Sequence, residues 1–352
     1  MAQQILNAQT VANPAAVSAA TPAATLESPD SWQYRALNAL NPGLSYLSDA
    51  LIELTRAGHP VIAGAADLQY SNGLNRYAQE YPDRYIQFGI SEQNMVSAAA
   101  GLATTGHMPF VATFASFLGL LCCEQIRMDV AYTKLPVRLI GHHTGISLGF
   151  YGTSHHATED ISTMRAIAGL TVVSPADGPQ LAAAIKASVD WPEPIYFRIG
   201  RGREPQVYED GQPFTFGQAI VHAEGKDLTL IACGIGVRAA LDAAQALRAE
   251  GHSVGVIDMA TIKPLDRAAV LRAAADCRLM ITVEEHNVLG GLGSAVAEVL
   301  ADEGLGVRLY RHGIQDEYSL IAPPTTLYAH YRLDAEGVAQ VAREQLSKGK
   351  QG

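Results

Sequence analysis

The chain has 352 residues, a formal net charge of −10 and a sequence pI of about 5.5; 48% of its residues are hydrophobic and 17% are charged. The acidic balance excludes general affinity for nucleic acid or anionic membranes, so any phosphate site must be local. This length favours two domains, and the low charged fraction favours a large interface with other subunits.

The N-terminus provides no targeting signal that would place the protein outside the cell. It lacks the basic start and continuous apolar stretch of a signal peptide, and no run of about 20 apolar residues suggests a membrane span. We therefore expect a cytoplasmic protein. Residues 1–33 are rich in Ala, Pro, Ser and Thr without a hydrophobic face, which predicts a flexible or partner-contacting arm.

Residues 34–204 alternate between helix and strand patterns, which predicts a parallel sheet between helices. Periodicity predicts helices at 45–58, 91–106 and 123–132, and strands at 60–67, 86–90, 108–114, 135–143 and 171–177. Gly, Pro and charged residues then mark a linker, placed at 205–215.

Residues 216–350 show the same alternation and predict a second domain. Strands are expected at 227–234, 252–259 and 278–285, and helices at 237–250 and 266–276. The expected fold class is α/β, with two doubly wound domains.

A possible dinucleotide fingerprint opens the first helix of that second domain. Gly234, Gly236 and Ala239 have the G-x-G-x-x-A spacing, and Asp258 ends the next strand. Such glycines allow a phosphate to approach a helix N-terminus, and the acid can bind ribose. An NAD-binding protein is therefore an alternative in a different cofactor class, although this spacing also occurs without a nucleotide.

Glu92 stands directly after a predicted strand, with Phe114 and Phe117 downstream. An acid in a first helical turn also suits the helix dipole, and phenylalanines are mostly core residues, so these residues alone leave both interpretations open. The whole segment RYIQFGISEQNMVSAAAGLATTGHMPFVATFASF, however, resembles the pyrimidine-binding domain of transketolase and of 1-deoxyxylulose-5-phosphate synthase. The resemblance continues through the second domain to the family's C-terminal domain.

The resemblance implies thiamine diphosphate as the cofactor. A glutamate at the position of Glu92 bonds the cofactor's aminopyrimidine and promotes proton loss from the thiazolium, chemistry that suits a carboxyl shielded from water. By the same resemblance, Phe114 and Phe117 stack on the aminopyrimidine, while Asp67 and Leu68 approach the thiazolium.

Four histidines lie in the Gly-rich stretch GHHTGISLGFYGTSHHATED, where their pKa suits proton transfer at neutral pH. Solvated loop histidines are the alternative; a metal site lacks nearby cysteines or an HExxH pattern. The resemblance gives His143 and His155 substrate-facing, catalytic positions, with His156 as a neighbour. Where transketolases have an aspartate that binds a sugar hydroxyl, this sequence has Tyr151. A phenol cannot offer the two acceptor oxygens of a carboxylate, which favours a substrate that differs from ordinary ketose phosphates.

Arg201 matches a phosphate-binding arginine of the family, and Ser71 matches a second phosphate contact. The ligand group would be a phosphate or another anion, such as a sulfonate. The alternative is that Arg198, Arg201 and Arg203 form a solvated linker or a subunit contact.

The chain contains no GDG, the motif with which the family holds the diphosphate and its Mg²⁺ or Ca²⁺. The resemblance therefore implies a GDG-containing, N-terminal-type transketolase subunit as partner, in an α2β2 heterotetramer. The implied reaction transfers a two-carbon ketol unit from a ketose to an aldehyde. The alternatives are a 1-deoxyxylulose-5-phosphate-synthase-like subunit, the β subunit of a 2-oxoacid dehydrogenase, and a noncatalytic interaction paralogue.

Overall fold

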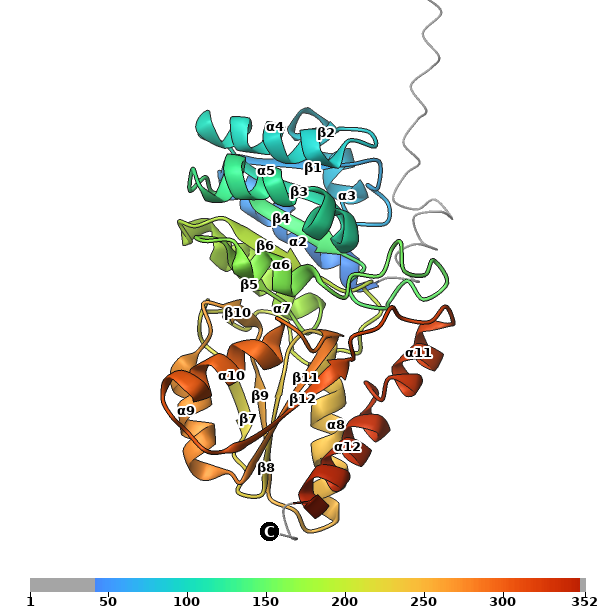
Figure 1. The fold of residues 1–352 in the computed structure, drawn as a ribbon. Helices are drawn as coiled ribbons and strands as arrows, with labels where there is room; N and C mark the ends of the chain where they lie inside the picture. The colour runs from blue at the N-terminus through green and yellow to red at the C-terminus, as the bar shows by residue number, and fades with distance from the viewer. Residues whose placement is uncertain (1–41, 349–352) are drawn as a thin grey trace, which may run out of the picture.

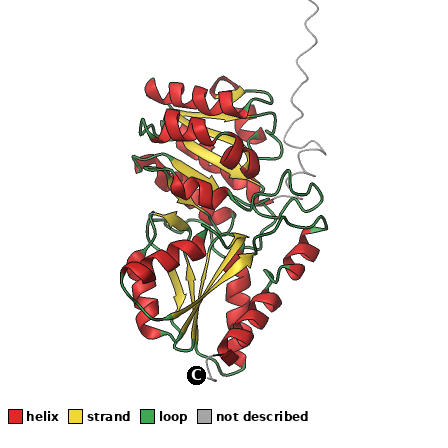
Figure 2. Ribbon diagram, in the orientation of Figure 1, coloured by secondary structure: helices red, strands yellow, loops and turns green. Residues whose placement is uncertain are grey.

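The computed structural model describes residues 42–348, so the predicted arm at 1–33 lies outside the described residues (Figure 1). Two α/β units are stacked one above the other, each with a central sheet covered by helices (Figure 2). The predicted fold class is confirmed. Within residues 42–348, every helix is too short or too polar to cross a membrane.

The first unit is built on a sheet in which β5, β6, β4, β3, β1 and β2 lie side by side and run parallel. Its elements are α2 (Pro42–Arg56), β1 (Val61–Ala65), α3 (Asn75–Glu80), η2 (Pro82–Arg84), β2 (Tyr85–Gln87), α4 (Glu92–Thr104), β3 (Met108–Phe114), η3 (Phe117–Leu121), α5 (Cys123–Gln125), η4 (Ile126–Ala131), β4 (Arg138–His142), α6 (Asp160–Ala166), β5 (Thr171–Val173), α7 (Gly178–Ala187), η5 (Ser188–Asp190) and β6 (Ile195–Arg198). The predicted strands are present, and the helix expected at 123–132 is a succession of π and α turns from 117 to 131.

The second unit has a five-stranded sheet of order β12-β11-β8-β9-β7, parallel except for β7. The elements of this part of the chain are β7 (Ile220–Ala223), β8 (Leu228–Ala232), α8 (Gly236–Ala249), β9 (Val254–Asp258), β10 (Thr261–Lys263), α9 (Arg267–Asp276), β11 (Leu279–Asn287), α10 (Leu292–Asp302), β12 (Arg308–Ile314), α11 (Pro324–His330) and α12 (Ala335–Lys348).

The two units contribute to one sheet and to one apolar core. Strand β10 belongs to the second unit in sequence, but it pairs antiparallel with β5 and so completes the first sheet. One apolar core also includes residues from both units, for example Met95 and Ile161 from the first and Ile257 and Leu292 from the second. The apolar face of α4 and α6 is therefore buried in a core that the second unit completes.

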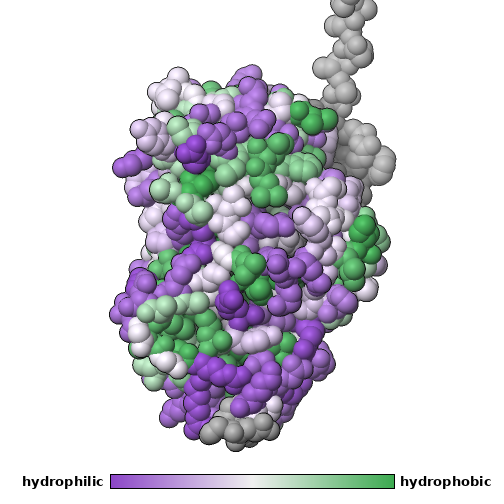
Figure 3. Space-filling view, in the orientation of Figure 1, coloured by the Kyte–Doolittle hydropathy of each residue, from purple (hydrophilic) through white to green (hydrophobic). Residues whose placement is uncertain are grey.

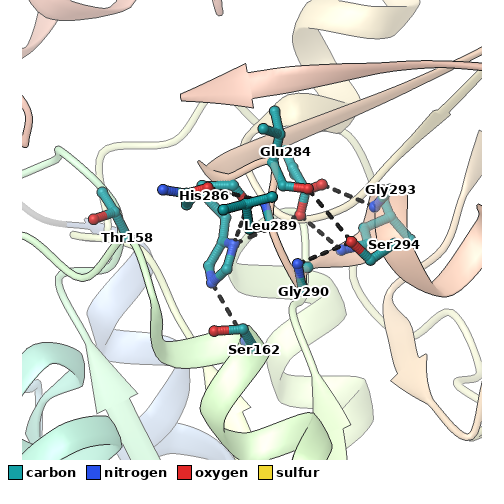
Figure 4. A network of polar contacts seen from close by, with 12 residues as sticks. Thr158, Ser162, Glu284, His286, Leu289, Gly290, Gly293 and Ser294 are labelled. Carbon is teal, nitrogen blue, oxygen red and sulfur yellow. Dashed lines mark hydrogen bonds and ion pairs between the residues drawn. The ribbon is translucent and has the colours of Figure 1, made fainter. Parts of the chain in front are cut away.

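A buried polar network also joins the units (Figure 4). The Glu284 carboxylate accepts hydrogen bonds from the backbone N–H groups of Leu292 (2.7 Å) and Gly293 (2.8 Å), at the start of α10. The backbone N–H of Ser162, in α6, donates to His286 Nε2 over 3.4 Å. Burial raises the pKa of Glu284 to about 7 and lowers that of His286 to about 4, so His286 is neutral at pH 7 whereas Glu284 changes its protonation near that pH.

Candidate active site

The sequence-predicted site residues all follow carboxyl ends of neighbouring strands in the first sheet, where ligands bind in open α/β folds. Glu92 follows β2; Asp67, Leu68 and Ser71 follow β1; Phe114 and Phe117 end or follow β3; His143, Tyr151, His155 and His156 follow β4; Arg201 follows β6. The topology therefore brings segments that are far apart in sequence to one edge of the sheet.

Glu92 is the first residue of α4, and only 7% of its surface is exposed. Its carboxylate has no hydrogen-bond or ion-pair partner among residues 42–348. The side chain lies near Cys122, whose thiol pKa is raised to about 12 by burial and by the charge of Glu92. The carboxylate oxygens are not among the fully buried polar atoms that lack a partner in the described residues, so they keep access to solvent, where a ligand can reach them.

Phe114 lies at the centre of a cluster of aromatic rings. Its centroid is 5.5 Å from Phe117, 4.8 Å from His142, 5.3 Å from His143 and 5.5 Å from His155. Phe117 also contacts His155, with 5.3 Å between the ring centroids. The structure therefore brings the predicted aromatic and histidine residues together, and these edge contacts suit a flat ring ligand.

His142 is a member of this cluster that sequence reasoning did not single out. Its Nδ1 lies 2.6 Å from Nδ1 of His143, so one ring donates to the other. Burial lowers the pKa of both, that of His143 to about 3, with a further contribution from Arg201 and Arg203. Both rings are therefore neutral at pH 7, and they can exchange hydrogen bonds with a substrate without carrying charge.

The lowered pKa of His143 predicts a specific pH dependence of stability. Between pH 6.5 and 3 the unfolded chain binds a proton at His143 that the folded chain excludes, so the free energy of unfolding decreases as the pH falls. We expect the free energy of unfolding of His143→Asn to fall by about 2 kcal/mol less than that of wild type between pH 7 and pH 5. Asparagine is chosen because it tolerates the positive φ of 56° at this position. Urea unfolding at both pH values measures this, and parallel losses would contradict it.

Tyr151 and His155 lie at the outer side of the cluster. Their ring centroids are 4.9 Å apart, and Tyr151 is 60% exposed. Burial also lowers the pKa of His155, which remains accessible at its edge. His156 lies differently, because its buried ring bonds through Nδ1 to the hydroxyl of Ser319 in the second unit.

Arg201 directs part of its guanidinium into the site region. Its Nη1 donates to the Ser147 carbonyl over 3.5 Å, whereas its buried Nε lacks a partner among the described residues. Burial and the neighbouring Arg203 lower its pKa. The unpaired Nε and the crowding of positive charge both favour an anionic ligand.

The segment after β1 is held by local hydrogen bonds. Asp67, at φ 57°, donates its backbone N–H to Gln87 Oε1 over 2.7 Å, which leaves the carboxylate exposed. The Ser71 hydroxyl donates to the Leu68 carbonyl over 3.1 Å, so a phosphate contact from Ser71 requires this bond to be exchanged. Within residues 42–348, no hydrogen bond joins these residues to the histidine cluster.

The interpretation of Arg198 as part of a solvated linker is wrong. Its side chain is 3% exposed, and Nε lies 2.9 Å from Asp160 Oδ2. The same guanidinium donates through Nη2 to the Ala157 and Glu285 carbonyls. Arg198 therefore joins α6, the histidine stretch and the second unit.

The structure argues against the NAD-binding alternative. The backbone N–H of Gly234 donates to the Ser174 carbonyl over 3.0 Å, and a Cβ at Gly234 would lie 2.7 Å from Ser174 Oγ. Asp258 is fully buried and accepts hydrogen bonds from Gln180 and Tyr208, so it cannot reach a ribose. The glycine turn therefore packs on the first unit. The described part of the chain has no group of three His, Cys, Asp or Glu residues that could hold a metal.

Comparisons with known proteins agree with this geometry. Residues 44–205 match the family described as transketolase, pyrimidine binding domain, and residues 217–338 match transketolase, C-terminal domain. The chain is 38% identical to a subunit of the apulose-4-phosphate transketolase of Phocaeicola vulgatus, covering 86% of this chain and 96% of the relative. It is 36% identical to the 6-deoxy-6-sulfo-D-fructose transketolase subunit SqwH of Clostridium sp., covering 84% and 92%.

Among solved structures, a split gene transketolase described as an inactive beta4 tetramer superposes with a TM-score of 0.77. It is 37% identical, and the match covers 86% of this chain and 97% of that one. The chain therefore belongs to the transketolase family and corresponds to its pyrimidine-binding and C-terminal domains.

Proposed function

We propose that this chain is one subunit of a heteromeric, thiamine-diphosphate-dependent transketolase-like enzyme. The observation that carries the proposal is Glu92, a 7% exposed residue whose carboxylate has no partner in the described residues and which lies at the same edge of the sheet as the aromatic rings of Phe114 and Phe117. These residues fit an aminopyrimidine, which needs one hydrogen-bonding carboxyl and apolar faces. When bound, thiamine diphosphate supplies a carbon nucleophile and an electron sink for breaking a C–C bond.

In this proposal each residue of the chain has a limited task. Glu92 hydrogen-bonds a pyrimidine nitrogen and holds or releases the shared proton there. Phe114 and Phe117 exclude water from the ring, while Asp67 and Leu68 border the thiazolium side. His143 and His155 hydrogen-bond the carbonyl and hydroxyl oxygens of the substrate.

We infer that the substrate is a ketose carrying a phosphate or another anion, whose two-carbon ketol unit passes to an aldehyde. Arg201 would bind the anion through its guanidinium, with Ser71 as a second contact. Tyr151 and His156 complete the proposed substrate-binding set. Tyr151 stacks beside His155 where the family has an aspartate, which favours a substrate with a different hydroxyl pattern.

We propose that the diphosphate and its Mg²⁺ or Ca²⁺ are held by a GDG-containing partner subunit, in an α2β2 heterotetramer. Exposed apolar side chains on the first unit support a large interface: Ile90 is 84% exposed, Leu121 52% and Tyr132 78%. Both relatives are themselves named as subunits.

Coexpression tests this function. The chain is purified with a GDG-containing chain encoded beside its gene, and the pair is assayed with thiamine diphosphate, Mg²⁺, phosphorylated or sulfonated ketoses and aldehyde acceptors. We expect a complex of two chains of each kind and activity only with both present. Pyruvate decarboxylation without ketol transfer would instead favour the deoxyxylulose-phosphate-synthase-like or dehydrogenase alternatives. No binding and no activity would favour the noncatalytic paralogue.

The role of Arg201 gives a separate prediction. Arg201→Gln is expected to raise the KM for an anionic ketose about 10- to 100-fold, because a charge-assisted hydrogen bond contributes about 1.5–3 kcal/mol. The KM for an uncharged ketose should change little. Arg278→Gln is the control, because that side chain is 87% exposed on the second unit. An equal change for both ketoses would contradict anion binding.

A further inference from the structure

Residues 144–157, here called the histidine loop, run from β4 toward α6 and carry Tyr151, His155 and His156. The loop is closed at its neck, where Gly145 and Ala157 exchange backbone hydrogen bonds of 3.1 and 2.9 Å. Beyond this neck, it extends from the first unit toward the segment around α11 (Figure 1). Its shape therefore depends on what it contacts there.

Glu285, at the end of β11, holds the first part of the histidine loop from the second unit. Its Oε1 accepts hydrogen bonds from the Ile146 backbone N–H (2.9 Å) and from the Tyr328 hydroxyl (2.6 Å). The approach is close enough that a Cβ at Gly145 would lie 2.0 Å from Glu285 Cδ. Because Glu285 is only 4% exposed, these bonds face little competition from water.

The middle and the end of the loop also rest on the second unit. A Cβ at Gly149 would lie 2.1 Å from the Ala322 carbonyl oxygen, and one at Gly152 would lie 2.8 Å from Ile321. His156 Nδ1 bonds the Ser319 hydroxyl. Ile146 is fully buried in a small core with residues of the second unit, namely Ile314, Leu327, Tyr331 and Leu333.

The surface where the histidine loop meets the segment before α11 carries exposed apolar side chains. Phe150 is 66% exposed, Leu320 53% and Ile321 68%. In Figure 3 a hydrophobic area lies at the right edge of the molecule, where Figure 1 places the loop beside α11. The loop and the segment before α11 therefore form one continuous surface at the rim of the site.

We propose that Glu285, Ser319 and Tyr328 are positioning residues, through which the second domain fixes the histidine loop and thereby the substrate-facing His155 and Tyr151. This inference rests on the proposed function. A catalytic group displaced by about 1 Å can lose about 100-fold in rate, so the support of the loop matters as much as its side chains.

Variants at position 285 separate support from simple folding. Glu285→Ala removes the acceptor and leaves the Ile146 N–H and the Tyr328 hydroxyl unpaired. Glu285→Gln keeps an acceptor oxygen at the same place, so it should restore the position of the loop. Glu336→Ala, a surface carboxylate of α12 with a 65% exposed side chain, is the matched control.

Hydrogen exchange in the isolated full chain tests the support directly, without the partner or any activity. In Glu285→Ala, we expect peptides from 144–157 to exchange at least about tenfold faster than in wild type, with β3 and β8 unchanged. Glu285→Gln and Glu336→Ala should match wild type. Unchanged exchange in Glu285→Ala, or an equal increase throughout the chain, would overturn the proposal.

The reconstituted complex tests the consequence for catalysis. We expect Glu285→Ala to lower kcat about 10- to 100-fold with a smaller change in KM, and Glu285→Gln to remain within about threefold of wild type. An active wild type with an equally active Glu285→Ala would overturn the positioning role. An inactive wild-type complex would count against the proposed function instead, while the exchange result would still decide whether the second domain holds the loop.

Discussion

Glu92→Gln is expected to lower the ketol-transfer activity of the reconstituted complex by about 100- to 10,000-fold, the range typical of a lost general acid or base. The amide retains the shape of the carboxyl group but cannot take up or release the proton at the pyrimidine. Because Glu92 has no partner among the described residues, the substitution breaks no internal bond, and stability and assembly should be preserved.

The matched control for this variant is Glu344→Gln. Glu344 lies in α12 of the second unit and pairs with Arg332 at the surface, with a 54% exposed side chain. It should keep full activity. Activity is measured by steady-state kinetics, and assembly by the mass of the complex in solution. Full activity of Glu92→Gln would remove the proposed role, whereas loss of assembly would make Glu92 a structural residue.

Arg198→Met is expected to destabilise the chain by about 3–5 kcal/mol, the cost of removing one partner from a buried ion pair. Arg198 and Asp160 are 3% and 0% exposed, and among residues 42–348 Asp160 would be left with the Tyr196 hydroxyl as its side-chain donor. The carbonyls of Ala157 and Glu285 would lose a donor as well. Urea unfolding measures the free energy of unfolding.

Two further variants test whether the uncompensated charge of buried Asp160 causes the loss of stability. The double variant Arg198→Met, Asp160→Asn should recover part of the loss, because it removes the uncompensated charge. Arg343→Met breaks a surface contact with Glu250 and should cost less than about 1 kcal/mol. If the Arg198 and Arg343 variants lost equal stability, the buried pair would have no special role.

The sequence predicts the elements that carry the first-sheet site well, since long periodic segments mark α4, β3 and β4 clearly. Helix α2 spans Pro42–Arg56 within the described residues, and so includes residues ahead of the amphipathic stretch predicted from 45. Strand β10 has no recognisable pattern, because three residues cannot show a period and its partner β5 lies far back in the chain. The pairing of β10 with β5 depends on the tertiary fold and cannot be predicted from the local sequence.

The contrast between local sequence patterns and contacts between distant segments also applies to the residues of the site. Glu92, Phe114 and His143 were predicted from the resemblance to the transketolase family, and the structure places each at or after the carboxyl end of a strand in the first sheet; their roles stay predictions. Glu285 carried no such signal, since it meets Ile146 across 139 positions of sequence. The charge of Arg198 suggested solvent, and only its pairing with Asp160 shows why it is buried.

Strand β10 limits how this chain can be divided or recombined. Thr261 and Lys263 pair with β5, so a fragment ending at the linker would leave β5 as a bare edge strand. Such an edge invites pairing with other chains and aggregation. A chimaera that exchanges the C-terminal domain between relatives therefore keeps β5 covered only if the incoming segment at 261–263 matches β5.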